Sequence, residues 1–326
     1  MKCFVIGSGG WGTALGMVLA ENGHEVTLWG PFEEEIAAIR ASGANAVYLP
    51  GVELPPSLQW TSDVSAVEQA DLVVLVVPSR FYRSTLETFK PHLKPEALIV
   101  SATKGLDETT HQRMSEVAAD VLEHDVAILS GPSHAEEVAR GVPTAVTVAG
   151  TDFQTLEKIQ AAFSGKTFRV YTSTDVIGVE LGGTLKNVIA VAAGILDGIG
   201  LGDNSKAALM TRGLAEISRL GAALGAKPET FSGLSGVGDL MVTCSSRHSR
   251  NRAVGEQLGK GESLEQIMGG MKQVAEGVWN AKAARDLANE LGVEMPITEE
   301  VCQIVENGKN PQQALKDLMS RDPKAE

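Results

Sequence analysis

The sequence contains few basic residues and few aromatic ones. Lysine and arginine total 28 against 41 aspartates and glutamates, which gives a formal net charge of -13, and aromatic residues make up 5% of the chain. A protein that binds nucleic acid or anionic membranes in general needs a broad basic surface. We therefore expect neither as a partner, although a small anion still fits wherever a few basic side chains converge.

Cysteine is also scarce. Only Cys3, Cys244 and Cys302 occur, and their spacing is unlike that of a zinc site. So few cysteines are typical of a protein whose thiols stay reduced. We expect three buried thiols, no metal site and a cytoplasmic location.

Long apolar runs are absent too. A membrane-spanning helix needs roughly 20 predominantly apolar residues, and the longest candidate, residues 188–196, is too short. Near the start, the run FVIG stops at a cluster of glycines, whereas a secretory signal has one continuous apolar segment. The sequence predicts neither a membrane span nor a signal peptide.

What the chain does contain is enough apolar sequence for two domains, with 326 residues of which 43% are hydrophobic. Up to about residue 148, short near-continuous apolar runs alternate with helical patterns; these runs are KCFVIG, EVTLWG, DLVVLVV, ALIVSATKG, VAILSG and TAVTVAG. Such runs are typical of parallel strands that are buried on both faces. We predict an α/β, Rossmann-like, doubly wound parallel sheet.

After about residue 173 the texture changes. The β-branched runs disappear, and apolar residues recur at helical spacing in segments rich in alanine, leucine and glutamate. We predict an all-α second domain, with a dinucleotide-binding domain over residues 1–178 and a helical substrate domain over residues 179–326.

A glycine loop follows the first predicted strand. In GSGGWG, Gly7, Gly9 and Gly12 match the GxGxxG pattern, and a helical pattern comes next. Gly7 permits the tight turn, Gly9 lets the backbone approach a pyrophosphate and Gly12 allows close packing of helix on strand. The context favours dinucleotide binding over a purely structural turn.

The end of the second predicted strand gives no clear cofactor preference. An acidic residue there binds the ribose of NAD, and a basic one favours NADP, but the chain has Gly30, Pro31 and Phe32. The acidic run 33–35 is expected to form a solvated first helical turn, and Arg40 lies too far along to assign. NAD(H) and NADP(H) both remain open.

Polar residues follow two later strands, where ligands bind in open parallel sheets. We expect Lys104, Gly131 and Ser133 to face the same crevice as the glycine loop. In the helical half, the densest cationic region follows a glycine-rich turn. It is either a phosphate grip or a solvated loop, and it contains Asp239, Thr243, Arg247, His248, Ser249, Arg250, Asn251 and Arg252.

A lysine stands at the head of the apolar stretch LGGTLKNVIAVAAGIL. Lys186 either extends its stem to water from the first helical turn or has a functional role, because an ammonium removed from water usually pairs or shifts its pKa.

Together these motifs resemble the bacterial NAD(P)-dependent glycerol-3-phosphate dehydrogenase family over nearly the whole chain. The matching segments are GSGGWGTAL, ATKGL, LSGPSHAEEVARGVPTAV, LKNVIAVAAGILDGIGLGDNSKAAL, GVGDLMVTCSSRHSRNR and VAEGVWNA. The resemblance implies reversible reduction of dihydroxyacetone phosphate to sn-glycerol 3-phosphate, which feeds glycerophospholipid synthesis. It also implies that Lys186 is the catalytic proton donor and acceptor.

The resemblance assigns the remaining site residues by motif. Catalysis would involve Lys104, Asn187, Asp239 and Thr243 beside Lys186. Substrate contacts would come from Lys104, Gly131, Ser133, Lys186, Asp239, Ser249, Arg250 and Asn251. Cofactor contacts would come from Gly7, Gly9, Gly10, Trp11, Gly12, Lys104, Ala135, Arg250, Val274 and Glu276.

Two alternatives stay open at this point. One is a reductase similar to 6-phosphogluconate or 3-hydroxyisobutyrate dehydrogenase, which also pairs a Rossmann domain with helices and a lysine. The other is a dinucleotide sensor without catalysis, for which the glycine loop would suffice. The helical half carries enough apolar surface for a homodimer.

Overall fold

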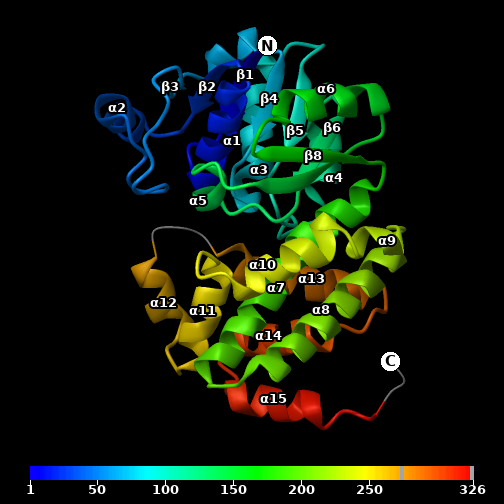
Figure 1. Ribbon diagram of the computed structural model, residues 1–326. Coiled ribbons are helices and arrows are strands. Elements are labelled where there is room, and N and C mark those ends of the chain that lie inside the picture. The colour runs from blue at the N-terminus through cyan, green and yellow to red at the C-terminus, as the bar shows by residue number, and fades with distance from the viewer. Residues whose placement is uncertain (272–274, 324–326) are drawn as a thin grey trace. The chain divides into compact units, whose positions relative to one another are not determined.

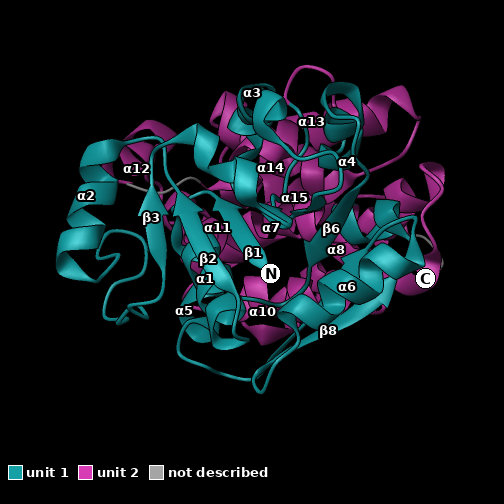
Figure 2. Ribbon diagram, turned by 90° about the horizontal axis from the view of Figure 1, so that it is seen from above, with its two compact units in different colours: residues 1–107, 112–180 teal, residues 108–111, 181–326 magenta. Residues whose placement is uncertain are grey.

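The chain forms two compact units (Figure 2). A computed structural model describes residues 1–271 and 275–323. Unit 1 comprises residues 1–107 and 112–180, and unit 2 comprises residues 108–111 and 181–326. Apart from the short segment 108–111, the chain passes from unit 1 to unit 2 once, within the long helix α7 (Val176–Gly198).

Unit 1 is built on one eight-stranded sheet with the order β3-β2-β1-β4-β5-β6-β7-β8. This crossover order, with β1 at the centre of the parallel part, is that of a doubly wound dinucleotide-binding fold. The strands are β1 (Lys2–Ile6), β2 (Glu25–Trp29), β3 (Gln59–Thr61), β4 (Leu72–Leu75), β5 (Leu98–Ser101), β6 (Val126–Ser130), β7 (Thr144–Ala149) and β8 (Phe168–Ser173).

The prediction of an α/β doubly wound parallel sheet is confirmed, with one strand pair that departs from the parallel pattern. β7 runs antiparallel to β6, and β8 pairs parallel with β7. Two edge strands, β3 and β8, were not predicted. β3 has only three residues, and β8 alternates buried and exposed positions instead of forming a continuous apolar run.

Helices cover both faces of this sheet, which explains the unbroken apolar strands. Val5 of β1 packs in one core cluster with Leu15 of α1 (Gly10–Glu21), whereas Phe4 points to the other face and contacts Phe89 of α3 (Tyr82–Phe89). Figures 1 and 2 show α1 and α6 on one face and α3 and α4 on the other. The other helical segments of unit 1 are α2 (Glu33–Ser42), α4 (Met114–Val121), α5 (Ala135–Val138), α6 (Phe153–Phe163), η1 (Val64–Gln69), η2 (Ser79–Phe81) and η3 (Lys90–His92).

The regular secondary structure in the described part of unit 2 is all helical, as predicted. It packs around the buried part of α7, and a kinked segment, η4 (Leu234–Gly238), leads into α10. Its other helices are α8 (Asp203–Ala223), α9 (Pro228–Phe231), α10 (Asp239–Ser245), α11 (Arg250–Gly259), α12 (Leu264–Gly270), α13 (Glu276–Glu290), α14 (Pro296–Asn307) and α15 (Pro311–Met319).

The long helix α7 corrects one expectation. It has 23 residues and a mean hydropathy of 1.4 over its best window, so by length and composition one segment does reach the size of a membrane span. Yet 89% of that window is buried inside the protein. A helix buried to this extent is a core helix, because protein already covers its apolar surface.

The three cysteines are buried and unbridged, as expected. Burial raises the pKa of each thiol to about 12. They therefore stay as uncharged thiols near neutral pH, which is the unreactive form.

A buried carboxylate joins two helices of unit 2. Glu216 of α8 accepts hydrogen bonds from the backbone N–H groups of Ile297 (2.7 Å) and Thr298 (3.2 Å) at the start of α14, and from the Thr298 hydroxyl (3.2 Å). Burial raises the pKa of Glu216 to about 7, with the hydrogen bonds partly opposing the shift. Its carboxyl group therefore holds a proton more tightly in the folded chain than in the unfolded one.

We predict that Glu216→Gln lowers the free energy of unfolding by about 1–3 kcal/mol at pH 5, because an amide nitrogen would face a helix N–H donor. Because the pKa of Glu216 is higher in the folded chain than in the unfolded one, its protonation stabilises the folded state at low pH. This contribution to the free energy of unfolding falls as the pH rises from the unfolded pKa to about 7. The advantage of the native chain should therefore narrow between pH 5 and pH 8. Urea unfolding at several pH values measures this.

The matched control is Glu229→Gln, which removes an exposed carboxylate in α9. It should leave the pH profile of the unfolding midpoint unchanged. A gap between the native chain and Glu216→Gln that stays constant from pH 5 to pH 8 would contradict the assignment.

Candidate active site

The glycine loop of unit 1 has the predicted conformation. Gly7 adopts a φ of +131°, which favours glycine. A Cβ on Gly12 would collide with the Gly7 carbonyl and touch Val5 of β1, so only glycine lets α1 start this close to the strand. At Gly9 nothing lies within 4 Å of an added Cβ, which leaves open space above the loop.

These features suit the pyrophosphate of a dinucleotide. The first turn of α1 presents backbone N–H groups and the positive end of the helix dipole beside the open space at Gly9. The indole Nε1 of Trp11, the second residue of α1, is buried without a hydrogen-bond partner among the described residues. A donor of this kind is available to a ligand, and both observations fit a bound nicotinamide dinucleotide.

Asn45 holds this loop in place. Its buried side chain donates to the carbonyl of Ser8 (2.8 Å) and to the hydroxyl of Thr13 (2.9 Å). The same segment brings the carbonyl of Tyr48 to 2.7 Å from where a Cβ of Gly10 would lie. Sequence reasoning missed Asn45, because a lone asparagine 32 residues beyond the contact gives no local signal.

A second group forms at the ends of β5 and β6. The Lys104 ammonium and the Ser133 hydroxyl both donate to the carbonyl of Gly131, at 3.2 and 2.9 Å. Gly131 has a φ of +141°, and a Cβ there would approach the backbone of β7. These three predicted residues therefore come together, and Ala135 lies close to Gly10 of the nucleotide loop.

Lys186 lies in the middle of α7, which corrects its predicted place at the head of a helix. The helix starts ten residues earlier, at Val176, because the segment before LGGTLKN is itself apolar and helical. Lys186 is only 7% exposed, so its stem does not reach to water. Of the two interpretations, the solvated surface lysine is the one that fails.

The buried ammonium is held by α10. Its Nζ lies 2.7 Å from Oδ1 of Asp239 and donates to the Thr243 hydroxyl at 2.6 Å. Thr243 in turn donates to the backbone carbonyl of Asp239 (2.7 Å). One turn of helix thus presents both oxygen partners of Lys186, which fixes the direction of the amine.

A glycine-rich turn brings Asp239 to this position. A Cβ on Gly182 of α7 would strike the carbonyl of Ser235, and one on Gly236 would strike the backbone of Phe231. The η4 segment can therefore lie directly on α7. Because α10 begins at Asp239, immediately after η4 ends, this contact also places Asp239 beside α7. This explains the spacing GVGDL in physical terms.

Asn187 and Asn251 connect three helices beside this ion pair. Asn251 of α11 donates to Oδ1 of Asn187 (2.9 Å), and its own Oδ1 accepts the backbone N–H of Gly277 in α13 (2.9 Å). Gly277 also packs against the carbonyl of Asn187. Sequence reasoning placed Asn251 at the substrate but missed Gly277, whose role depends on contacts far away in the chain.

The predicted cationic region is partly helix and partly loop. Ser249 caps α11 by accepting the backbone N–H of Arg252 at 3.2 Å, Arg250 starts the helix with an exposed side chain, and Arg252 pairs with Asp197 at 2.7 Å. Glu276 is the first residue of α13. Val274 lies outside the described residues. In residues 1–271 and 275–323, no group of three or more His, Cys, Asp or Glu side chains is placed to bind a metal.

Two family models match this chain. One describes the N-terminus of NAD-dependent glycerol-3-phosphate dehydrogenase and covers residues 2–156, and the other describes its C-terminus and covers residues 175–316.

Curated relatives and solved structures agree with this. Glycerol-3-phosphate dehydrogenase [NAD(P)+] of Moorella thermoacetica is 52% identical over 97% of this chain and 95% of its own, and that of Chlorobium phaeobacteroides is 50% identical over 100% and 99%. The glycerol-3-phosphate dehydrogenase structure from Coxiella burnetii is 39% identical with a TM-score of 0.95, covering 98% of this chain and 99% of its own.

The Saccharomyces cerevisiae glycerol-3-phosphate dehydrogenase structure covers 98% of this chain and 99% of its own, at 29% identity and a TM-score of 0.83. The likeness therefore extends over both units. The chain belongs to the NAD(P)-dependent glycerol-3-phosphate dehydrogenase family and is an oxidoreductase that uses a nicotinamide dinucleotide.

Proposed function

We propose that this chain carries out the reversible NAD(P)H-dependent reduction of dihydroxyacetone phosphate to sn-glycerol 3-phosphate, with Lys186 as the proton donor and acceptor. The observation that carries the proposal is the buried Lys186 ammonium, directed by Asp239 and Thr243. A lysine held this way in a core helix needs a reason to be there, since a buried ion pair contributes little net stability.

The chemistry assigned to Lys186 follows from its surroundings. Bound NAD(P)H supplies the hydride that reduces the C2 carbonyl carbon. Lys186 donates a hydrogen bond and then its proton to the carbonyl oxygen as that oxygen gains negative charge. Asp239 keeps the ammonium oriented and compensates its charge. In the oxidative direction, the neutral amine takes the proton from the C2 hydroxyl.

The other site residues bind and orient. We assign the phosphate to Arg250, because a guanidinium offers paired donors and this one is exposed at the start of α11. Ser249, Asn251 and Asn187 complete this set. We also assign Lys104, Gly131 and Ser133 to the substrate, on the basis of the family motifs that they match. The nucleotide set is Gly7, Gly9, Gly10, Trp11, Gly12, Lys104, Ala135, Arg250, Val274 and Glu276.

We propose further that the functional division lies at residues 178/179, and that the enzyme is cytoplasmic. The scarcity of cysteine and the absence of a basic excess support this setting and speak against nucleic acid or membrane partners. The substrate proposed is a phosphorylated triose, and phosphorylated sugar acids and 3-hydroxy acids are the competing class to screen.

We predict that Lys186→Met lowers kcat by at least 10²-fold, which is within the usual range for loss of general acid catalysis, and leaves NADH binding within about two-fold. Lys186→Arg should be similarly slow, because arginine keeps the charge but does not give up its proton near neutral pH. Steady-state absorbance at the nicotinamide band and NADH fluorescence titration measure the two effects.

Two further variants serve as controls. Lys282→Met removes an exposed lysine of the same unit and should leave kcat unchanged. Lys186→Met combined with Asp239→Asn avoids a buried unpaired carboxylate and guards against misfolding. Native turnover in a folded Lys186→Met protein would remove this residue from the mechanism, and nucleotide binding without any turnover of dihydroxyacetone phosphate by the native chain would favour the sensor.

The phosphate assignment makes a separate prediction. Arg250→Ala should raise the KM for dihydroxyacetone phosphate by about ten-fold or more, because one charge-assisted contact is lost, with a smaller change in kcat. Arg212→Ala, an exposed arginine of α8, is the matched control. If the native enzyme reduced unphosphorylated dihydroxyacetone as efficiently as dihydroxyacetone phosphate, the assignment of Arg250 to phosphate binding would be wrong.

We also predict that the chain is a homodimer. The helical half offers apolar surface for self-association, and a stable dimer would have about twice the 34.3 kDa of one chain. Light scattering after size exclusion measures the mass. A monomer mass at micromolar concentration would contradict this prediction.

A further inference from the structure

The end of β2 is where a dinucleotide-binding sheet distinguishes NAD from NADP. The first acidic residue after this strand is Glu33, which is the 21st residue after Gly12 of the glycine loop. Carboxylates that bind the adenosine ribose of NAD stand about 20 residues beyond the fingerprint. Residue 30 does not take this role, because glycine has no side chain to accept a hydrogen bond.

Glu33 forms hydrogen bonds at this edge of the sheet, with 59% of its side chain exposed. Its Oε2 accepts the hydroxyl of Ser62 at 2.5 Å, and its Oε1 accepts from Arg40. Ser62 follows β3 directly, and its carbonyl accepts the indole N–H of Trp29, the last residue of β2, at 3.0 Å. The carboxylate is therefore tied to the carboxyl ends of both strands, beside which α2 runs (Figure 1).

The negative charge at the start of α2 disfavours binding of the 2′-phosphate of NADP. Three carboxylates, Glu33 to Glu35, form the first turn of α2, and Arg40 is the only basic residue between Gly30 and Gly43. The guanidinium of Arg40 is engaged by Glu33 itself. A 2′-phosphate carries nearly two negative charges near neutral pH, whereas a 2′-hydroxyl can donate to a lone pair that Glu33 still has available.

We propose that this chain selects NADH over NADPH, with Glu33 as the residue that accepts the ribose hydroxyl and repels a 2′-phosphate. The inference rests on the proposed function for its setting but concerns nucleotide binding alone. Gly30, Pro31 and Phe32, which directly follow β2, have no charged side chain, so Glu33 is the first residue after the strand that can distinguish the two nucleotides.

The test is fluorescence titration of native protein with NADH and with NADPH, in the absence of any substrate. We expect the Kd for NADPH to exceed that for NADH by at least ten-fold. Glu33→Gln removes the charge, keeps an acceptor oxygen and releases Arg40. In this variant the ratio of the two Kd values should fall at least five-fold, mainly through tighter NADPH binding.

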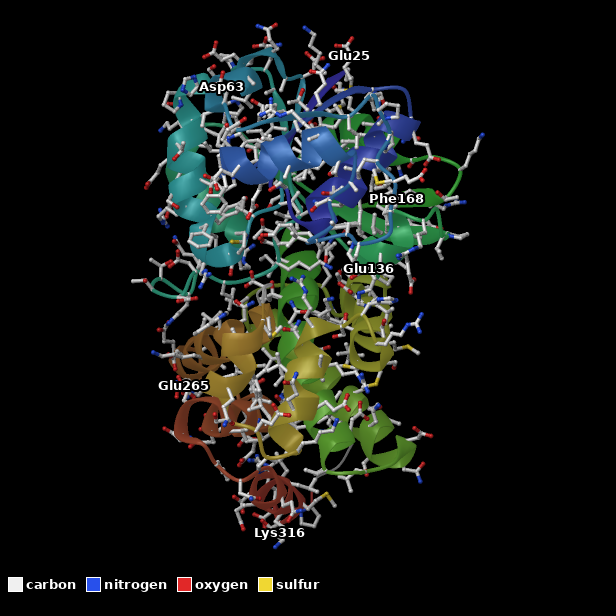
Figure 3. The ribbon with its side chains drawn as sticks, turned by 90° about the vertical axis from the view of Figure 1, so that its left-hand side faces the viewer. Glu25, Asp63, Glu136, Phe168, Glu265 and Lys316 are labelled. Atoms are coloured by element: carbon white, nitrogen blue, oxygen red, sulfur yellow. The ribbon has the colours of Figure 1, made fainter. Side chains whose placement is uncertain are left out.

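The matched control is Glu25→Gln, which removes an exposed carboxylate from the amino end of β2, the strand that precedes Glu33. Figure 3 shows Glu25 at the opposite end of unit 1 from Glu136, which lies on α5 next to Ala135. This control should leave the ratio unchanged.

Equal or tighter binding of NADPH by the native protein would overturn the proposal, as would an unchanged ratio in Glu33→Gln. Either result is independent of whether dihydroxyacetone phosphate is the substrate. Failure of the proposed reaction would instead appear as absent turnover with both nucleotides, whatever their Kd values.

Discussion

The ion pair between Lys186 and Asp239 is the interaction that determines how α10 lies on α7 in unit 2. Both side chains are almost wholly removed from water, with 8% and 1% of their surfaces exposed. Removing either partner would leave an uncompensated charge in the core, which is strongly destabilising. The pair therefore constrains α10 to lie against the middle of α7. It also keeps the amine at one place and in one orientation, which is what a proton donor requires and what a solvated lysine on a flexible stem lacks.

Close packing of backbones makes this arrangement possible. A Cβ on Gly194 of α7 would collide with the carbonyl of Arg252, and one on Gly255 of α11 would collide with the carbonyl of Val191. The two helices thus touch through their backbones. This contact sets α11 at the height on α7 where Asn251 reaches Asn187, so these two residues share the support of α7 with the amine.

Local sequence predicts the parts of this molecule whose physics is local. The GxGxxG loop follows from the positive φ at Gly7 and the close packing at Gly12, and the doubly wound sheet follows from apolar runs buried on both faces. The sequence did not predict that β7 is antiparallel to β6, because an apolar run carries no direction. Nor did it place Lys186 within its helix. The roles of Asn45 and Gly277 depend on partners at least 26 residues away, which no short motif encodes.

The pairing of Lys186 also decides how an acidic chain handles an anionic substrate. Because Asp239 lies 2.7 Å from the ammonium, the pair has no net charge and attracts a phosphate only weakly. Phosphate binding must then come from other donors, such as a guanidinium and the backbone N–H groups at helix starts. In the proposed mechanism this division places the two tasks on separate side chains: the phosphate is bound by other donors, and the Lys186 ammonium, oriented by Asp239 and Thr243, is kept for the reacting oxygen.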